Sequence, residues 1–384
     1  MPSLKLRNIG QVTESDLTFG DLTVFVGPQA TGKSIALQFL KLMVDTGQVQ
    51  EELSRNGLDW SGRLPEFFDV YFGEGMHGIW REGHSKVSWD GSEVDMHRLT
   101  GRRRKSKTES LFFIPAQRVL TLRDGWPRPF TDYSSGDPFA VREFSEKLRL
   151  LVEQESSAGQ QVFPQPRRLK TEFRELLERH VFGGFQLKVD KVRSQKRFVL
   201  GTNGDPLPFM VWSAGQREFV PLLLGLYWLM PSTKVSMRGT LQWVVIEELE
   251  MGLHPRAISV VLLMVLELLA RGYRVCLSTH SSQVLEAVWA LRHLAASGAP
   301  PASLLAMFNA PNTQPMQKLA KEVMKKQLKV HYFDPGGQTR DISELDPDSE
   351  QGAESGWGGL ADFSSQANAA VARAVAAQRR GEAS

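Results

Sequence analysis

Apolar and polar residues follow one another along the chain in a way that predicts short strands joined by loops and helices. Residues 22–26 are apolar apart from one threonine and predict a buried strand, and residues 35–43 place apolar side chains at helical spacing. Residues 4–9 alternate between apolar and polar side chains, as a half-buried strand does, and a second short strand is expected at 17–19. These first segments predict a small antiparallel sheet beside a strand–loop–helix unit.

The same alternation of strands and helices continues to the end of the chain. Further strands are predicted at 111–115, 185–189, 197–200, 241–246, 273–278 and 329–333, and further helices at 140–155, 168–180, 219–230, 255–270, from 282 onward and at 367–379. Strands that alternate with helices in this way are typical of a parallel sheet covered on both faces. We therefore expect an α/β fold with a mainly parallel sheet, an antiparallel β subdomain and a helical insertion.

Breaks in the pattern suggest four consecutive segments. They are a first lobe at 1–120 with an insertion of mixed composition at about 45–109, a helical insertion and hairpin at 121–205, the second part of the central fold at 206–335, and an acidic C-terminal tail with an Ala-rich helix at 336–384. The role of the helical insertion at 137–181 does not follow from its sequence.

The loop after the strand at 22–26 carries phosphate-binding chemistry. It consists of Gly27, Pro28, Gln29, Ala30, Thr31, Gly32, Lys33 and Ser34, which fits the Walker A pattern G-x-x-x-x-G-K-[ST] without a mismatch. Its glycines let backbone N–H groups curl around phosphate oxygens, and the following helix presents its positive end to the same anion. Lys33 is expected to reach the β- and γ-phosphates and Ser34 to ligate Mg²⁺. The sequence therefore predicts a nucleoside triphosphate with Mg²⁺.

Polar residues at the ends of three other predicted strands complete the candidate site. Glu247 and Glu248 follow the strand at 241–246. Because consecutive side chains of an extended segment point in different directions, we assign Glu247 to Mg²⁺ and Glu248 to the attacking water. His280 ends the next strand and could hydrogen-bond the γ-phosphate, and Gln117 could bind Mg²⁺ and water. The alternatives are an acidic surface turn for the glutamates and a structural role for the histidine.

The helix predicted at 219–230 is preceded by a second candidate phosphate contact. Ser213, Ala214, Gly215 and Gln216 offer a hydroxyl, an accessible backbone N–H and a helix N-terminus. Ser213 and Gln216 also match a capping box, which is an ordinary way to close a helix N-terminus. The two interpretations are compatible with each other.

In this order the motifs resemble those of ABC-type ATPases. The matching positions are the Walker A loop at 27–34, the Q-loop at Gln117, the signature at 212–216, Walker B at 246–248, the D-loop at 251–255 and the H-loop at His280. Within that superfamily, Glu-Glu-Leu-Glu-Met-Gly-Leu-His-Pro and Ser-Thr-His-Ser are similar to the wording of the SMC/RecF-like and overcoming-lysogenization-defect-like branch.

This resemblance implies an ABC-type P-loop NTPase head that uses ATP and Mg²⁺, with Lys33, Glu248 and His280 as catalytic residues. It also implies that Ser213, Gly215 and Gln216 contact the ATP of a second head, so that two copies of the chain close head to tail. Ala214 stands where the first signature glycine is usual, and Leu249 where a proline is usual. Neither departure removes a chemical group, so hydrolysis is expected to be retained even if it is slowed.

Composition limits the remaining choices. The chain has a net charge of +3, so nucleic-acid binding would need a local patch, such as the basic run Arg102, Arg103, Arg104 and Lys105. A single cysteine, Cys276, excludes disulfides within the chain and Cys-based zinc sites. Neither a signal peptide nor an apolar run long enough for a membrane span occurs in the sequence. We expect a cytoplasmic protein without a membrane partner.

Three functions are compatible with such a head. The first is an ATP-driven switch or scaffold, of two or more subunits, that controls a separate nuclease or toxin, as in bacterial anti-phage defence. The second is a DNA-repair or chromosome-maintenance head that clamps DNA directly through the basic run at 102–107. The third is a transporter's nucleotide-binding subunit, which the wording around Glu247 and the long insertion before Gln117 disfavour.

Overall fold

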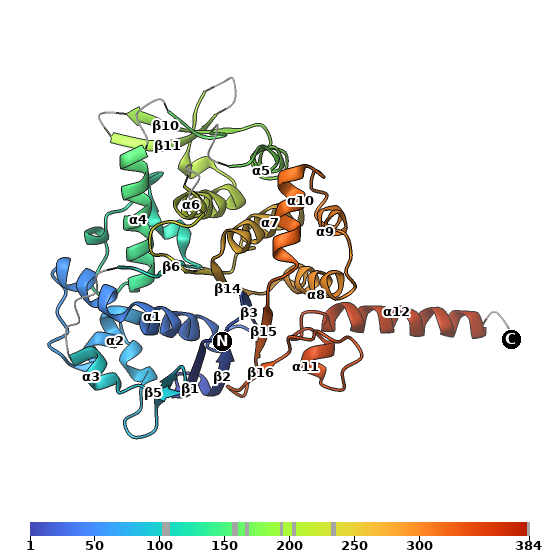
Figure 1. Ribbon diagram of the computed structural model, residues 1–384, viewed down its shortest axis with the longest axis horizontal. Helices are drawn as coiled ribbons and strands as arrows, with labels where there is room; N and C mark the ends of the chain where they lie inside the picture. Colours follow the sequence, from blue (N-terminus) through green and yellow to red (C-terminus); the bar gives the residue numbers. More distant parts are fainter. Residues whose placement is uncertain are drawn as a thin grey trace.

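A six-stranded sheet with the order β16-β15-β3-β14-β13-β6 lies at the centre of the computed structural model (Figure 1). Five strands are parallel, and β16 runs antiparallel to β15 at one edge. The strands are β3 (Leu22–Val26), β6 (Leu111–Ile114), β13 (Trp243–Glu247), β14 (Arg274–Thr279), β15 (Leu328–Phe333) and β16 (Thr339–Asp341). The structure describes residues 1–101, 108–155, 160–165, 169–192, 195–201, 205–231 and 236–381.

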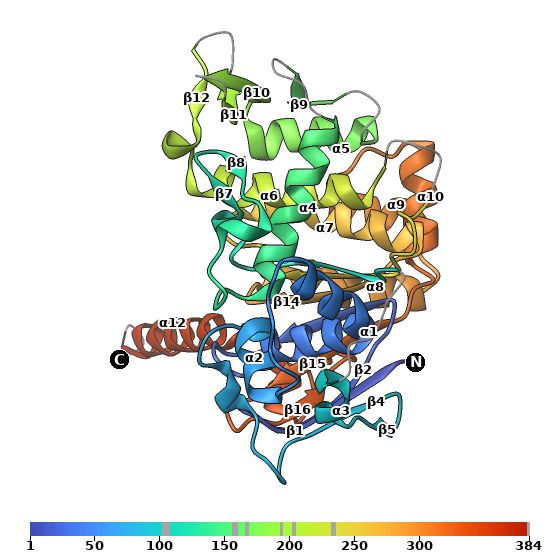
Figure 2. The same cartoon turned by 90° about the vertical axis from the view of Figure 1, so that its left-hand side faces the viewer.

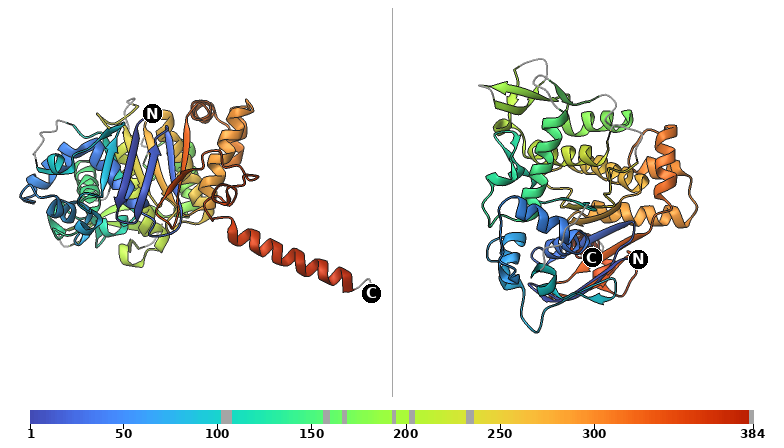
Figure 3. Two further views of the ribbon diagram at one scale, coloured as in Figure 1. Left: turned by 90° about the horizontal axis from the view of Figure 1, so that it is seen from below. Right: turned by 60° about the vertical axis from the view of Figure 1, so that its left-hand side comes forward.

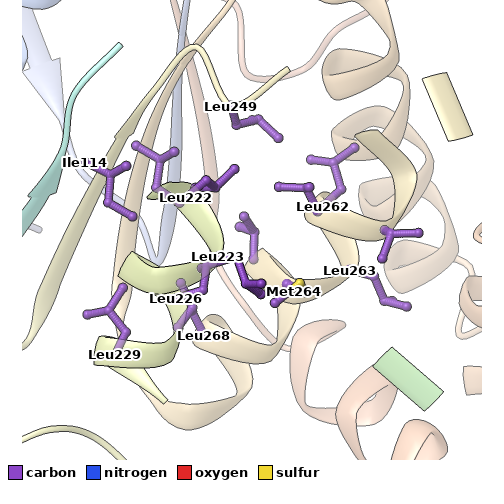
Figure 4. Close-up of a cluster of buried hydrophobic side chains, with 14 of the residues drawn as sticks. Ile114, Leu222, Leu223, Leu226, Leu229, Leu249, Leu262, Leu263, Met264 and Leu268 are labelled. Atoms are coloured by element: carbon purple, nitrogen blue, oxygen red, sulfur yellow. The ribbon is translucent and has the colours of Figure 1, made fainter. Parts of the chain in front are cut away.

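Successive residues of the central strands enter two different cores, because side chains alternate between the faces of a sheet. On one face, Phe25, Val245 and Cys276 belong to a core with α1 (Lys33–Arg55) and α2 (Leu64–Phe72). On the other face, Val24 and Val244 belong to a core with three helices. Those helices are α6 (Ala214–Leu229), α7 (Pro255–Arg271) and α8 (Ser282–Ala296), and leucines of α6 and α7 interlock beneath the sheet (Figure 4). The predicted α/β class is confirmed.

An antiparallel sheet with the order β2-β1-β4-β5 lies beside α1 and supports the first lobe (Figure 2). Its strands are β1 (Ser3–Ile9), β2 (Val12–Thr18), β4 (Lys86–Trp89) and β5 (Ser92–Glu93), and α3 (Met96–Gly101) follows them. β1 pairs with both β2 and β4, so the strand predicted at 4–9 is internal to this sheet. The predicted antiparallel β subdomain is therefore confirmed.

A second antiparallel sheet lies at the opposite end of the molecule, above α6 (Figure 2). Its order is β12-β11-β10-β9, and the predicted hairpin corresponds to the pairing of β10 with β11. This region contains β9 (Gln161–Phe163), β10 (Gln186–Val192), β11 (Gln195–Gly201), β12 (Leu207–Pro208), the hairpin of β7 (Leu122–Arg123) and β8 (Trp126–Pro127), and the helices α4 (Phe139–Glu155) and α5 (Thr171–Leu177).

The insertion at 45–109 is more helical than its sequence suggests. α1 continues from the predicted stretch at 35–43 to Arg55 across a kink at Asp45, and α2 follows it. Val49 and Leu53 are buried on the far side of the kink, so the apolar face of the helix is maintained by packing. Charged and polar residues around them hide the helical spacing of the apolar positions in the sequence. Tertiary contacts therefore determine the helical conformation of this segment.

The acidic tail predicted at 336–384 begins with a β-strand. Asp341 lies in β16 and accepts hydrogen bonds from Lys329 at 2.7 Å and from the backbone N–H of Ser343 at 2.9 Å. After α9 (Pro301–Met307) and α10 (Gln314–Val323), the chain ends in α11 (Gly352–Ser355) and α12 (Asp362–Gly381). Helix α12 extends away from the body of the molecule (Figure 3).

Buried charges join the phosphate-loop helix to the helical insertion. Lys41 of α1 is fully buried, and its Nζ lies 3.0 Å from Asp45, 2.9 Å from Glu109 and 3.3 Å from Glu143 of α4. Lys147 contacts Glu109 and Glu143 as well. Although burial alone would raise it, the charges and hydrogen bonds of Lys147 and Lys41 lower the pKa of Glu109 to about 2.

Removing the central lysine of this cluster should destabilise the protein. In Lys41→Met three acidic side chains lose a buried partner, so the free energy of unfolding is expected to fall by about 3 kcal/mol. Urea denaturation measures this change. Lys5→Met, which removes an exposed ion pair to Asp16, is the control and should lower stability by less than about 1 kcal/mol. Equal losses in the two variants would contradict a special role for the buried cluster.

Candidate functional site

The Walker A loop connects β3 to α1 and is tightly enclosed. Gly27 has a φ of 143°, and a Cβ at this position would lie 2.2 Å from the carbonyl oxygen of Phe333 in β15. Gly32 has a φ of 94°, and its Cβ would lie 2.4 Å from the side chain of Val12 in β2. Both positions therefore require glycine, because neighbouring elements and backbone conformation leave no room for a side chain. The predicted strand–loop–helix setting of the motif is present.

Lys33 lies in the loop with its ammonium group held by backbone oxygens. Its Nζ donates hydrogen bonds to the carbonyl of Gly27 at 2.8 Å and to that of Pro28 at 2.6 Å. Burial lowers the pKa of Lys33 to about 8, and the charges of Glu248 and Glu250 partly oppose this shift. Lys33 is therefore already positioned at the loop. A bound phosphate group would supply negative charge that stabilises its ammonium form.

The two glutamates predicted at the end of β13 have different surroundings. Glu247 is buried, and its Oε2 accepts a hydrogen bond from the backbone N–H of Ala116 at 3.1 Å. Burial raises the pKa of Glu247, while the nearby hydroxyl of Ser34 and the Ala116 N–H oppose the rise. Glu248 is partly exposed and adopts a left-handed conformation with φ of 45°. Its backbone N–H donates to the carbonyl of Ser278 in β14 at 3.0 Å.

A cavity of about 180 Å³ lies between the Walker A loop and Glu248. The end of the Walker A loop forms one wall, and Glu248, Ser278 and His280 form another. His280 Nε2 lies 3.7 Å from Glu248 Oε1. The carboxylate of Glu250 fixes this wall, because its Oε1 accepts hydrogen bonds from the Thr279 hydroxyl at 2.9 Å and from the His280 backbone N–H at 2.5 Å. The complete lining is Gln11, Gln29, Ala30, Thr31, Gly32, Lys33, Ser34, Ile35, Glu248, Ser278 and His280.

The side-chain oxygen atoms of Ser34 and Glu247 fit a magnesium ion as ligands. Glu247 Oε1 is buried without a hydrogen-bond partner among the described residues, although Ser34 lies beside this carboxylate. Hydroxyl and carboxylate oxygens suit Mg²⁺, which typically uses one or two protein ligands together with phosphate oxygens. Over the described ranges, no group of three or more histidine, cysteine, aspartate or glutamate side chains could hold a metal without such phosphates. Ser34 and Glu247 are the residues that would hold the ion at this loop.

The signature segment lies outside this cavity. Ser213 caps α6, where its hydroxyl accepts from the Gln216 N–H at 3.3 Å and the Gln216 side chain accepts from the Ser213 N–H at 3.0 Å. The predicted capping box is thus present. Ser213 is exposed, and Gly215 is half-exposed. A Cβ on Gly215 would lie 2.8 Å from the carbonyl oxygen of Gly252, so a side chain has no room there. Neither Ser213 nor Gly215 lines the cavity around the Walker A loop of its own chain.

Gln117 is not brought into the cavity. Its side chain is exposed, and it is absent from the residues that line the site. The loop itself does approach the site, because Ala116 hydrogen-bonds Glu247. The candidate nucleic-acid residues Arg102, Arg103, Arg104 and Lys105 lie outside the described residues.

Arg118 is a central residue that we did not predict from the sequence. Its side chain is completely buried. Its Nη1 donates to the carbonyl of Glu247 at 3.0 Å, its Nη2 to that of Glu248 at 2.9 Å, and its Nε to that of Glu218 in α6 at 3.2 Å. One guanidinium group therefore joins the glutamate pair to the helix that begins at Ser213. The only local signal for Arg118 in the sequence was its place directly after Gln117, shortly after an apolar strand.

The pKa of Lys33 predicts how nucleotide affinity depends on pH. In the protein without nucleotide, the Lys33 side chain is half protonated near pH 8. Bound phosphates favour its ammonium form. Binding therefore takes up a proton only above this pH. In metal-free buffer we expect the affinity for ATP to be constant just below pH 8 and to fall by up to about tenfold per pH unit above it. Titration with a fluorescent ATP analogue measures this, and Lys33→Arg should bind without the pH dependence.

Comparisons with known proteins find one family model that matches part of the chain. Residues 103–286 match the family described as "AAA domain, putative AbiEii toxin, Type IV TA system". This segment contains Gln117, Ser213, Glu248 and His280, and the Walker A loop precedes it. No curated protein matches the chain. Within the described ranges, the structure contains no helix that is both long and apolar enough to cross a membrane.

Several solved structures share low sequence identity with the chain. An SMC head bound to the C-winged helix domain of ScpA is 11% identical, with a TM-score of 0.41 over 74% of this chain and 90% of that chain. A dimeric bacterial ABC transporter cassette is 11% identical, with a TM-score of 0.36 over 88% of this chain and 97% of that one. The SMC head domain from Thermotoga maritima is 14% identical, with a TM-score of 0.32 over 74% and 90% of the two chains.

Proposed function

We propose that this chain carries an ABC/SMC-like AAA ATPase head, which hydrolyses ATP between two copies that close head to tail. The Walker A loop of one copy holds the triphosphate, and the signature segment of the other copy completes the site. The observation that carries this proposal is that Ser213, which is exposed, and Gly215, which is half-exposed, lie at a helix N-terminus outside the cavity that contains Lys33, Glu248 and His280.

The cavity supports this division of labour because it supplies one side of a phosphate site. The loop N–H groups and Lys33 bind the β- and γ-phosphates, and Glu248 accepts a proton from the attacking water. His280 lines the same cavity and its Nε2 lies 3.7 Å from Glu248 Oε1, and we assign it to the γ-phosphate. When Mg²⁺ is bound through Ser34 and Glu247, it neutralises charge on the phosphate oxygens. The Ser213 hydroxyl and the N-terminus of α6 supply donors for the side that this chain leaves open.

Closure on ATP and opening after hydrolysis would make the head a switch. ATP can bias a partner protein only if that partner binds the open and closed states with different affinity. We propose that the partner is a separate effector, a nuclease or toxin of an anti-phage defence system. The description of the matched family, which names a putative AbiEii toxin and a Type IV TA system, supports the link to a toxin system.

Complementation between two inactive variants tests the shared site. Lys33→Ala removes the phosphate-loop lysine, and Ser213→Arg blocks the signature, so each variant alone should have no measurable ATPase activity. In a mixed dimer, one of the two sites combines the intact Lys33 of one copy with the intact Ser213 of the other. Random pairing makes about half of the dimers mixed, so an equal mixture should recover about a quarter of wild-type turnover.

The control is an equal mixture of Lys33→Ala with Lys33→Met, which should stay inactive because every site lacks the lysine. Thermal melting establishes that each variant is folded. If the mixture of Lys33→Ala and Ser213→Arg stays inactive although both variants are folded and associate, the two residues do not act in a shared site and the proposal is wrong.

A further inference from the structure

A polar groove with a volume of about 710 Å³ is lined by residues that follow the Walker A loop by about 90 positions or more in the sequence. One wall is formed by the β7–β8 hairpin and the residues after it, and the other wall by β10 and β11. The lining residues are Arg123, Asp124, Trp126, Pro127, Arg128, Pro129, Asp132, Val192, Gln195, Lys196 and Arg197. None of them lines the nucleotide cavity.

The two walls of the groove are fastened to each other. The β7–β8 turn places Asp124 and Gly125 at φ of 52° and 82°, as a tight hairpin turn requires. The carbonyl of Gly125 accepts a hydrogen bond from the N–H of Phe198 in β11 at 2.8 Å. A Cβ on Gly125 would lie 3.0 Å from Phe209 and 3.1 Å from the carbonyl of Phe198. The hairpin is therefore held in place before any ligand binds.

The lining of the groove is predominantly cationic. Arg123, Arg128, Lys196 and Arg197 line it together with the carboxylates of Asp124 and Asp132. Arg197 is also paired with Asp190 at 3.1 Å, so the other three cations are the main phosphate donors. The guanidinium carbon of Arg128 lies over the Tyr133 ring, 3.8 Å from its centroid, and Arg128 Nε is buried without a hydrogen-bond partner among the described residues. Arg123 is largely exposed and lies 3.7 Å from Asp132, which is a weak pair in water.

An aromatic side chain lies among these charges. Trp126 is half-buried, with one contact to Phe198 at a ring distance of 5.1 Å and the Lys196 ammonium 5.8 Å from its ring. Arginines suit phosphate groups because their guanidinium forms two parallel hydrogen bonds. A tryptophan beside them offers a surface on which a base can stack. Acidic peptides would use the cations but not the aromatic ring.

We propose that this groove binds single-stranded nucleic acid, with phosphates on the arginine and lysine side chains and a base on Trp126. A single strand is favoured over a duplex because only unpaired bases can turn into a groove and stack. This goes beyond the proposed ATPase, and it concerns a different surface of the chain. Binding can be measured without nucleotide, so its outcome does not depend on whether ATP is hydrolysed.

The groove is also connected to the signature segment by direct packing. Gly125 meets Phe209, and the Phe209 ring packs against Trp212 at a ring distance of 5.2 Å. Trp212 directly precedes Ser213, which caps α6. A nucleic acid bound against the β7–β8 hairpin would thereby act, through Phe209 and Trp212, on the segment that positions the signature. We therefore expect the bound strand to change ATP turnover as well.

Fluorescence anisotropy with a labelled oligothymidylate tests the binding site. Arg123→Glu/Lys196→Glu is expected to weaken binding by about tenfold or more and to flatten its salt dependence by about 0.7 for each lost phosphate contact. The matched control, Lys318→Glu/Lys321→Glu, changes the same charge on the exposed face of α10 and should bind as the wild type does. Trp126→Leu should weaken binding about fivefold or more without changing the salt dependence, because stacking involves no counterion.

Circular dichroism checks that each variant is folded. Wild-type affinity in the folded double variant would overturn the proposal, as would loss of binding only when residues 102–107 are replaced. Polyglutamate that competes as well as oligothymidylate would show a site for acidic polypeptides instead, and equal affinity for duplex DNA would overturn the preference for single strands. Competition by oligothymidylate alone, together with the tryptophan effect, would support the assignment.

Discussion

Replacing Glu248 with glutamine is expected to lower ATP turnover by about 10²–10⁴-fold while leaving ATP binding intact. Glu248 lines the cavity beside the Walker A loop, and its carboxylate lies near His280. Glutamine preserves the size and the hydrogen-bonding reach of the side chain but cannot accept a proton from water at neutral pH. The loss should therefore appear in kcat, with little change in the affinity for ATP.

The same variant should accumulate as a dimer in the presence of ATP. In the proposed head-to-tail model, closure requires bound triphosphate and opening requires its hydrolysis, so a slow site would trap the closed state. Light scattering with and without ATP measures the change in mass. Glu286→Gln, at an exposed position of α8, is the matched control and should hydrolyse ATP at the wild-type rate. A Glu248→Gln protein that binds ATP but stays monomeric at saturation would contradict the head-to-tail model.

The phosphate loop could be predicted from the sequence because all of its parts are contiguous. Gly27 and Gly32 mark the two positions where the chain has positive φ and no space for a side chain. The strand before the loop and the helix after it have clear patterns of their own. The edge of the sheet could be predicted too, since parallel strands end on the same side. The structure accordingly places Glu248 and His280 in one cavity with Lys33.

Residues whose role depends on distant partners could not be predicted in this way. Lys41 follows Leu40 in an apolar helix and is balanced by Glu109 and Glu143, which come much later in the chain. Arg118 is balanced by carbonyl groups of β13 and α6, and no local pattern indicates them. For the same reason, the position of Gln117 at the end of β6 could not show that its side chain would be exposed.

The groove illustrates a third case, in which local patterns are visible but their meaning is not. The basic residues around β10 and β11 and the Asp124-Gly125 turn can be seen in the sequence. The hydrogen bond between Gly125 and Phe198 and the contact between the Trp126 and Phe198 rings bring the two hairpins together. The cationic surface is therefore a product of tertiary packing, whereas the basic run at 102–107 was conspicuous because its charges are consecutive.

Arg118 provides the second large effect that we expect. In Arg118→Met, carbonyl oxygens of Glu247, Glu248 and Glu218 lose their donors inside the protein, and neighbouring acidic side chains lose a compensating charge. Removing one partner from such a buried arrangement lowers the free energy of unfolding by about 3–5 kcal/mol. Urea denaturation measures this loss, and Arg55→Met, at an exposed arginine of α1, should change stability by less than about 1 kcal/mol.

Arg118→Lys separates the positioning role from the stabilising role. Lysine restores a positive charge near the acidic side chains, but it lacks the planar fork that reaches two successive carbonyls. Glu248 has a left-handed backbone, which costs about 1–3 kcal/mol and persists only when its surroundings hold it. We therefore expect Arg118→Lys to regain much of the lost stability while kcat stays at least about tenfold below the wild type and ATP affinity is unchanged. A stable Arg118→Lys protein with wild-type kcat would show that the guanidinium does not position Glu248.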